Sequence, residues 1–221
     1  MTMDIIPKIW ENEYVKTAIM VILLVAVVFG FWYGSQLVLN TEYPALAVAS
    51  GSMCKVEHMY CDGWSHPFSQ TLHVGDLIIV QGVDADSIKG TYPHSDIIVF
   101  HKPGNLGELI VHRVVAKEEK NGVTCFWTKG DGNGRHKWPE TPDRSEYDSW
   151  GCVSEELVIG KVILRIPWIG HIALFLHNSS GIFIIIILIV ILVIVEFVIP
   201  VFSSEKAEVD SGEKSENTGE T

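Results

Sequence analysis

Two long apolar segments constrain this 221-residue chain more than any other feature. Segment 17–34, TAIMVILLVAVVFGFWYG, has no charged residue, and segment 181–200, GIFIIIILIVILVIVEFVIP, has only Glu196. Each approaches the roughly 20 residues that an α-helix needs to cross a bilayer. The sequence therefore predicts two transmembrane helices, at 17–39 and 181–200, and argues against a wholly soluble protein.

The predicted helices separate three further parts of the chain. These parts are a cytoplasmic N-terminal arm at 1–16, an extracytoplasmic domain at 40–178 and an acidic cytoplasmic tail at 201–221. From residue 203 onward the tail has no aromatic residue and little hydrophobicity, which predicts disorder.

The lysines predict the orientation in the membrane. Lys8 and Lys16 precede the first apolar segment, and the next basic residue after it is Lys55. The positive-inside rule then puts both termini of a two-span protein in the cytoplasm, as a multi-pass protein of the cell membrane. A cleaved signal peptide is a second interpretation, because ALAVAS at 45–50 offers Ala-x-Ala twice, but the apolar core is longer than a usual signal core.

The region between the apolar segments has the pattern of β-strands. Short runs rich in Val, Ile and aromatic residues alternate with Gly, Pro, Asn and Asp, and no long helical period appears. This pattern predicts a mainly β domain, folded as an antiparallel barrel or sandwich. The predicted strands are 77–83, 96–102, 108–117, 123–129 and 156–166.

The charge of the chain excludes one class of partner. Acidic residues outnumber basic ones by 27 to 16, and the formal net charge is -11. Because no segment forms a basic patch, we expect no nucleic-acid partner.

A serine and a histidine are the first candidates for chemistry. Ser52 lies in Ala-Val-Ala-Ser-Gly-Ser-Met at 47–53, where small side chains would let a substrate backbone approach closely. A plain turn after a membrane helix explains the same residues. His112 lies among aliphatic residues on a predicted strand, where it is either a structural residue or a general base that needs a serine on one ring nitrogen and an acceptor on the other.

Two aspartates are candidates for that acceptor. Asp131 lies in the Gly-rich turn Lys-Gly-Asp-Gly-Asn, where turn chemistry explains it equally well. Asp143 lies in Pro-Asp-Arg-Ser-Glu-Tyr, twelve residues after Asp131. Either carboxylate could hold the tautomer of an imidazole and stabilise its charged form.

Four short motifs occur in order after the first apolar segment, and together they resemble the type I signal peptidases. The resemblance is closer to the archaeal and endoplasmic-reticulum branch, which carries His where the bacterial enzymes carry Lys. Each motif alone is weak, whereas the ordered set is specific. The motifs are Ser-Gly-Ser-Met at 50–53, Gly-Asp-Leu-Ile at 75–78, Val-His-Arg-Val at 111–114 and Lys-Gly-Asp-Gly-Asn at 129–133.

The resemblance implies a membrane serine endopeptidase that needs no cofactor and cuts signal peptides from translocated preproteins after Ala-x-Ala sites. Ser52 matches the nucleophile and His112 the general base. Asp143 fits the third member better than Asp131, which matches the Gly-Asp motif itself. Ser50 matches a hydroxyl that joins the backbone N–H of Ser52 in the oxyanion hole. The implied partners are secretory preproteins and the lipid bilayer, and contact with the translocation machinery fits the same activity.

The chain also departs from the family pattern. Cys54 and Lys55 stand where the family usually has Pro after the Met, and Gly132 stands where it usually has Asn. The gap between Asp131 and Asp143 is longer than usual, which leaves the choice of the acidic residue open.

The four cysteines all fall in the predicted extracytoplasmic domain, where disulfides can persist. Of three possible connectivities, local closure favours Cys54–Cys61 with Cys125–Cys152. A zinc site is the alternative for the first pair, because an N/S set of this kind can bind zinc. Its four ligands would be Cys54, His58, Cys61 and His66.

A function of another class also fits the predicted spans and strands. A non-catalytic two-span membrane protein could use its outer β-domain to bind or scaffold secreted proteins. It would leave the ordered motifs unexplained. Replacing Ser52 distinguishes the two hypotheses, because only an enzyme loses its activity.

Overall fold

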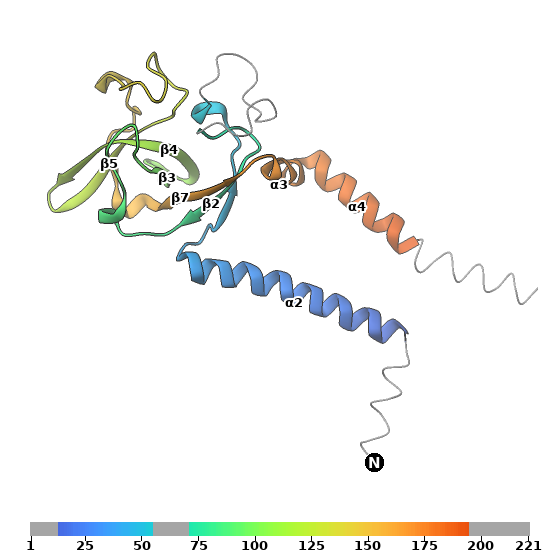
Figure 1. Ribbon diagram of the computed structural model, residues 1–221. Helices are drawn as coiled ribbons and strands as arrows, with labels where there is room; N and C mark the ends of the chain where they lie inside the picture. Colours follow the sequence, from blue (N-terminus) through green and yellow to red (C-terminus); the bar gives the residue numbers. More distant parts are fainter. Residues whose placement is uncertain (1–12, 55–70, 195–221) are drawn as a thin grey trace, which may run out of the picture. The chain divides into compact units, whose positions relative to one another are not determined.

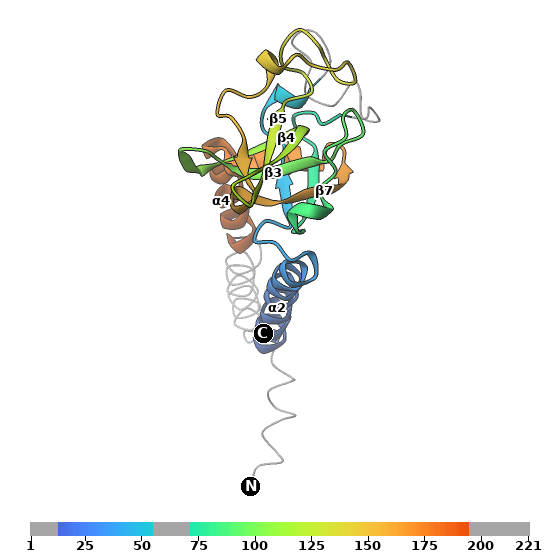
Figure 2. The ribbon, with the colours of Figure 1, turned by 90° about the vertical axis from the view of Figure 1, so that its left-hand side faces the viewer.

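The computed structural model describes residues 13–54 and 71–194. Its main body is an antiparallel β-sheet, which confirms the predicted β class. Within the described residues seven strands form one sheet in the order β1-β2-β7-β3-β4-β5-β6, and every pairing is antiparallel. The sheet is strongly twisted (Figures 1 and 2). The strands are β1 (Ala45–Ala47), β2 (Leu77–Gln81), β3 (Ile97–Lys102), β4 (Asn105–Lys120), β5 (Val123–Lys129), β6 (Val153–Ser154) and β7 (Val158–Ile166).

The five strands expected from the sequence correspond to β2, β3, β4, β5 and β7. The two short edge strands, β1 and β6, were not expected, because two or three residues are too few for a period of two to be recognised. Between β4 and β5 the turn is Asn121-Gly122, and both residues have a positive φ. A two-residue turn of this kind matches the right-handed twist of the strands that it joins.

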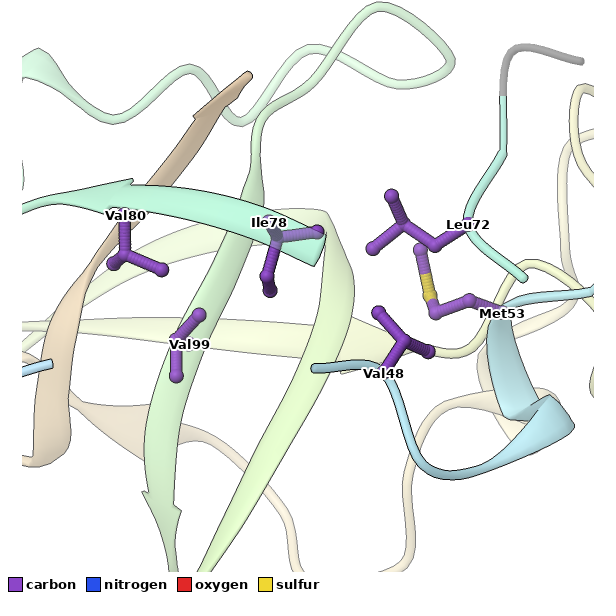
Figure 3. Close-up of a cluster of buried hydrophobic side chains, with 6 residues drawn as sticks. All are labelled: Val48, Met53, Leu72, Ile78, Val80 and Val99. Atoms are coloured by element: carbon purple, nitrogen blue, oxygen red, sulfur yellow. The ribbon is translucent and has the colours of Figure 1, made fainter. Parts of the chain in front are cut away.

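Two clusters of buried side chains stabilise the sheet. The first cluster lies next to the turn that carries Ser52. Figure 3 shows its six side chains converging from that turn, from β2 and β3, and from the coil segments that hold Val48 and Leu72. Its members are Val48, Met53, Leu72, Ile78, Val80 and Val99. The second cluster is centred on Phe100 and Phe126. Because Met53 belongs to the first cluster and directly follows Ser52, packing of the core fixes the position of that serine.

The N-terminal helix α2 (Glu13–Leu39) precedes the sheet. It contains the stretch Val15–Leu39, which is long and apolar enough to cross a membrane. The helix ends at Asn40, whose φ of 50° is a conformation that Asn tolerates and that commonly stops a helix. The predicted first span at 17–39 therefore corresponds to an apolar helix of sufficient length.

The prediction of a second span at 181–200 is not supported. Among the residues that the structure describes, helix α4 (Ser179–Val193) covers 15, fewer than the roughly 20 needed for a span. It joins the apolar helix α3 (Ile169–His177) only as a pair bent at the break between them. Residues 181–193 of the predicted span all lie in α4, which begins directly after Asn178. Residues 195–200, like the predicted tail at 201–221, lie outside the described residues.

The predicted bridge between Cys125 and Cys152 is present. It joins β5 to the segment just before β6 across 27 residues of sequence. Closing a loop of this length removes conformational entropy from the unfolded chain. The bridge therefore limits the loop that connects β5 to β6, which contains much of the candidate site.

Replacing Phe126 should destabilise the domain strongly, because its side chain is fully buried in the second cluster. We expect Phe126→Ala to lower the free energy of unfolding by about 3–5 kcal/mol, since it leaves a large cavity. The control is Leu106→Ala on β4, where the side chain is 63% exposed and the expected loss is below about 0.5 kcal/mol. Denaturant unfolding of the purified chain measures both, and equal losses would contradict this description of the core.

Candidate active site

Ser52 lies in the middle of a single 3₁₀ turn, Gly51–Met53, that follows β1. The turn is closed by a hydrogen bond from the Cys54 N–H to the Gly51 carbonyl. The backbone carbonyl of Ser52 accepts a hydrogen bond from the Gly132 N–H at 3.0 Å. A Cβ on Gly132 would collide with the backbone of Cys54, so the close approach of these two segments requires glycine there.

His112 reaches Ser52 from the middle of β4. Its Nε2 lies 3.0 Å from the Ser52 Oγ, although the two residues are 60 positions apart in sequence. The pairing of His112 with Ile98 on β3 fixes this position. The imidazole is 4% exposed and stacks on the Trp150 ring at 5.7 Å between centroids. Neighbouring side chains thus hold the ring in place and shield it from water.

The other ring nitrogen of His112 faces Asp148. The distance from Nδ1 to the Asp148 Oδ2 is 2.6 Å, and both side chains are less than a tenth exposed. An ionised carboxylate can only accept a hydrogen bond, so Nδ1 carries the hydrogen. The Nε2 lone pair is then free to accept the hydroxyl hydrogen of Ser52. Ser52, His112 and Asp148 form a continuous hydrogen-bonded chain with the geometry of a nucleophile, a base and an orienting acid.

Two contacts fix Asp148 in turn. Its N–H donates to the Thr128 carbonyl at 2.9 Å, which joins the end of the loop to β5. The Thr128 hydroxyl donates to the Asp148 Oδ2 at 2.7 Å, and the Trp150 indole approaches that hydroxyl at 3.4 Å. The carboxylate is therefore oriented by β5 as well as by the imidazole.

The expectation that Asp143 or Asp131 contacts His112 is not met by this geometry. Asp143 is 71% exposed, and its carboxylate lies 4.0 Å from His136 instead. The Asp131 carboxylate is occupied by Arg113, which donates from Nε and Nη2 at 2.8 Å each. A carboxylate with two bonds to one guanidinium cannot also face the imidazole on the opposite side of β4.

Asp131 and Arg113 form a buried ion pair beside the site. The Thr71 hydroxyl is 3.0 Å from the Asp131 Oδ2 and also donates to the Met53 carbonyl. The Arg113 guanidinium lies 4.7 Å from the centre of the Trp138 ring. These contacts connect Met53, which follows Ser52, with Arg113, which follows His112. The ion pair therefore positions Ser52 and His112 without contacting the Ser52 hydroxyl or the His112 imidazole.

Ser50 lies close enough to Ser52 to act with it. The two hydroxyl oxygens are 3.4 Å apart. A groove of about 240 Å³ opens beside them, with one wall from the segment that carries Ser52 and the other from β4. The groove is lined by Leu46, Ala47, Val48, Ala49, Ser50, Ser52, Met53, Glu108, Leu109, Ile110, Val111 and His112.

Both walls of this groove present strand edges without a second neighbour among the residues that the structure describes. On one wall, Val48 bonds back to Asp76 and Gly75, so the backbone groups of the adjacent Ala47 and Ala49 point the other way. On the other wall, β5 pairs with β4 only from Arg113 onward. An extended peptide could therefore bond to both edges at once.

The zinc alternative does not fit the structure at Cys54. That cysteine is in a disulfide and so offers no thiolate to a metal. Its predicted partner Cys61, and the other two proposed ligands His58 and His66, lie outside the described residues.

Sequence reasoning missed five residues of the site. Asp148 and Trp150 lie in Tyr-Asp-Ser-Trp, which resembles none of the motifs, and Thr128 and Thr71 are isolated hydroxyls. One signal was available for Arg113. It follows His112 on a strand, and a charged side chain among aliphatic residues needs a counter-charge nearby.

Removing Asp131 should destabilise the fold, because it leaves the Arg113 charge buried without a partner. We expect Asp131→Asn to lower the free energy of unfolding by about 3 kcal/mol. The matched control is Glu118→Gln, which breaks an exposed pair with Arg144 and should cost less than about 1 kcal/mol. Thermal and denaturant unfolding measure both variants. Similar losses in the two would show that burial of the Asp131 pair has no special importance.

Comparison with known proteins identifies relatives of the chain. No family model matches it. It is 28% identical over 149 residues to the human and mouse "Signal peptidase complex catalytic subunit SEC11C", and the match covers 66% of this chain and 64% of those subunits. It is 27% identical over 164 residues to the SEC11 subunit of Eremothecium gossypii, covering 72% of this chain and 80% of that protein.

These relatives belong to the family that the four motifs resemble. The relatives are catalytic subunits of signal peptidases, and the matched length is sufficient to include the β-domain. The chain is a homologue of these subunits, and its resemblance to the endoplasmic-reticulum branch of the type I signal peptidases is confirmed.

Proposed function

We propose that this chain is a membrane-bound serine endopeptidase that removes N-terminal signal peptides from translocated preproteins. The observation that carries the proposal is the hydrogen-bonded chain from the Ser52 Oγ through His112 to Asp148, at 3.0 and 2.6 Å, beside an open groove. A scaffold that only binds other proteins has no need for this arrangement. The homologous catalytic subunits support the same reaction.

In the proposed mechanism, the Ser52 Oγ attacks the carbonyl carbon of the scissile peptide bond. His112 Nε2 takes the hydroxyl proton and then gives it to the leaving amine. Asp148 holds the tautomer with hydrogen on Nδ1 and stabilises the imidazolium. Water next attacks the acyl-enzyme with His112 as the base, and Ser52 is regenerated.

The oxyanion of the tetrahedral intermediate needs donors on the opposite side of Ser52 from His112. We assign this role to the Ser50 hydroxyl and the backbone N–H of Ser52. Support comes from the distance of 3.4 Å between the Ser50 and Ser52 hydroxyl oxygens, which puts Ser50 beside the atom that attacks. Such preorganised donors stabilise charge that develops in the transition state.

The substrate would bind in the groove as an extended strand. Its backbone would bond to the edges beside Ala49 and Ile110, and its side chains would alternate between the walls. The small volume of the groove, about 240 Å³, favours small side chains before the cut. We therefore propose cleavage after Ala-x-Ala sites.

We further propose that α2 anchors the β-domain to the membrane. Lys16 lies at the N-terminal end of the apolar stretch Val15–Leu39, which supports a cytoplasmic N-terminus and a β-domain on the opposite side. In this topology the segment at 181–200 would return through the bilayer. Anchoring raises the effective concentration of membrane-bound substrate at the site. The relatives are named as subunits of a complex, so assembly with other subunits is part of the proposal.

Replacing members of the triad tests the mechanism, with a purified preprotein as substrate and metal chelated by EDTA. Ser52→Ala should abolish cleavage, and Asp148→Asn should lower kcat by roughly 10³–10⁴-fold because the imidazole loses its orienting acceptor. Asp143→Asn should lower kcat far less, and the variant Asp86→Asn, at an exposed position, should have the kcat of the wild type. Thermal unfolding verifies that each variant is folded.

Three outcomes would contradict these assignments. Cleavage by Ser52→Ala at the wild-type rate would overturn the assignment of Ser52 as nucleophile, whereas no cleavage by the wild-type chain would favour a binding protein. If Asp143→Asn is inactive and Asp148→Asn is active, Asp143 rather than Asp148 is the residue that orients His112.

Filling the groove tests the proposed substrate position. Ala49 is exposed beside Ser50, so Ala49→Phe should obstruct the groove without disturbing the core. We expect kcat/KM to fall by about tenfold or more, which corresponds to ~1.4 kcal/mol of transition-state stabilisation. Leu106→Phe, on β4 but outside the groove, is the control. An unchanged kcat/KM in Ala49→Phe would mean that the substrate binds elsewhere.

A further inference from the structure

Three side chains with metal-binding chemistry meet in the loop between β5 and Asp148. One nitrogen of His136 and one oxygen each of Asp143 and Glu146 all lie within 4.8 Å of one another. His136 Nδ1 is 2.6 Å from the Glu146 Oε1 and 4.0 Å from the Asp143 Oδ2. The proposed peptidase mechanism uses none of these three groups.

The spacing of these atoms suits a small transition-metal ion. Two ligands of a tetrahedral zinc ion are roughly 3.3 Å apart, because Zn–N and Zn–O bonds are each about 2.0 Å long. The separations of 2.6 and 4.0 Å lie on either side of that value. Rotation of the exposed Asp143 and half-buried His136 side chains would bring both separations toward that value, and water would complete the coordination.

The surrounding loop holds the two half-buried ligands in place. The backbone N–H of His136 donates to the Glu146 Oε2 at 3.0 Å, which leaves Oε1 directed at the imidazole. Lys129 donates to the His136 carbonyl at 2.7 Å and to the Asn133 carbonyl at 2.6 Å. Such outer contacts orient metal ligands and reduce the cost of ordering them.

The charges around the cluster are compatible with a cation. Two of the three ligands, Asp143 and Glu146, are carboxylates, whose charge suits a cation. Arg144 lies between the two acids in sequence, yet it pairs with Glu118 and covers the Trp127 ring at 5.0 Å.

We propose that His136, Asp143 and Glu146 form a transition-metal site, suited to Zn²⁺, that fastens the loop carrying Asp148. The imidazole favours zinc, copper or nickel over calcium and magnesium, which prefer oxygen ligands. Glu146 lies two residues before Asp148, so an ion bound there ties His136 to the segment that positions the acid of the triad. The site is separate from Ser52 and does not depend on the peptidase activity.

The test is calorimetric titration of Zn²⁺ into the full-length Ser52→Ala chain, purified in detergent without reductant and freed of metal by EDTA. We expect one zinc ion per chain and a rise in Tm. His136→Ala should weaken binding by more than about tenfold, because a lost ligand costs more than a lost outer-shell contact. Asp143→Asn should weaken zinc binding too. Because Asp143 is exposed, this substitution should disturb the fold less than His136→Ala.

Two histidine variants are the controls. His94→Ala removes an exposed imidazole outside the cluster, and His112→Ala removes the imidazole of the triad. Both should keep one zinc ion with unchanged affinity, whether or not the chain is a peptidase. The proposal is overturned if zinc does not bind, if His136→Ala and Asp143→Asn bind it as the wild type does, or if either control loses it. Tighter binding of Ca²⁺ than of Zn²⁺ would also overturn it.

Discussion

The site depends on the register of β4, because two consecutive residues of this strand, His112 and Arg113, belong to its two parts. These parts are the hydrogen-bonded chain from Ser52 to Asp148 and the buried ion pair with Asp131. His112 and Arg113 point to opposite sides of the backbone, as neighbours on a strand must. One reaches Ser52 and Asp148, and the other pairs with Asp131 beside the turn after Ser52. A slip of one residue would exchange the imidazole and the guanidinium and would break both arrangements at once.

The position of the acid depends on a loop rather than on a strand. Asp148 follows a long connection from β5, and it returns to that strand through the bond from its N–H to the Thr128 carbonyl. Three aspartates, at 131, 143 and 148, lie in this connection. Sequence spacing cannot choose among them, because the path of an irregular loop is fixed by contacts such as Lys129 with His136 rather than by a period.

The parts of the fold that the sequence predicted are those set by local patterns. β5 was expected at 123–129, because alternation and flanking turn residues are visible in a short window. The bridge from Cys125 to Cys152 was favoured by simple closure. The second span at 181–200 is not supported. Hydropathy locates an apolar segment, but the part of it that the structure describes as the helix α4 has only 15 residues. Ser52 and His112 were found through their motifs, whereas Asp148 has none.

The open edges of the groove complete the argument from structure to function. Unpaired strand edges invite aggregation, and proteins usually cover, shorten or charge them. Here the edges at Ala47–Ala49 on one wall and at 108–112 on the other face the same narrow space, with Ser52 at its end. Two such edges facing each other are costly for a domain that binds nothing extended. They fit the proposed function, in which a peptide substrate supplies the missing strand and bonds to both edges while its carbonyl is held against the serine.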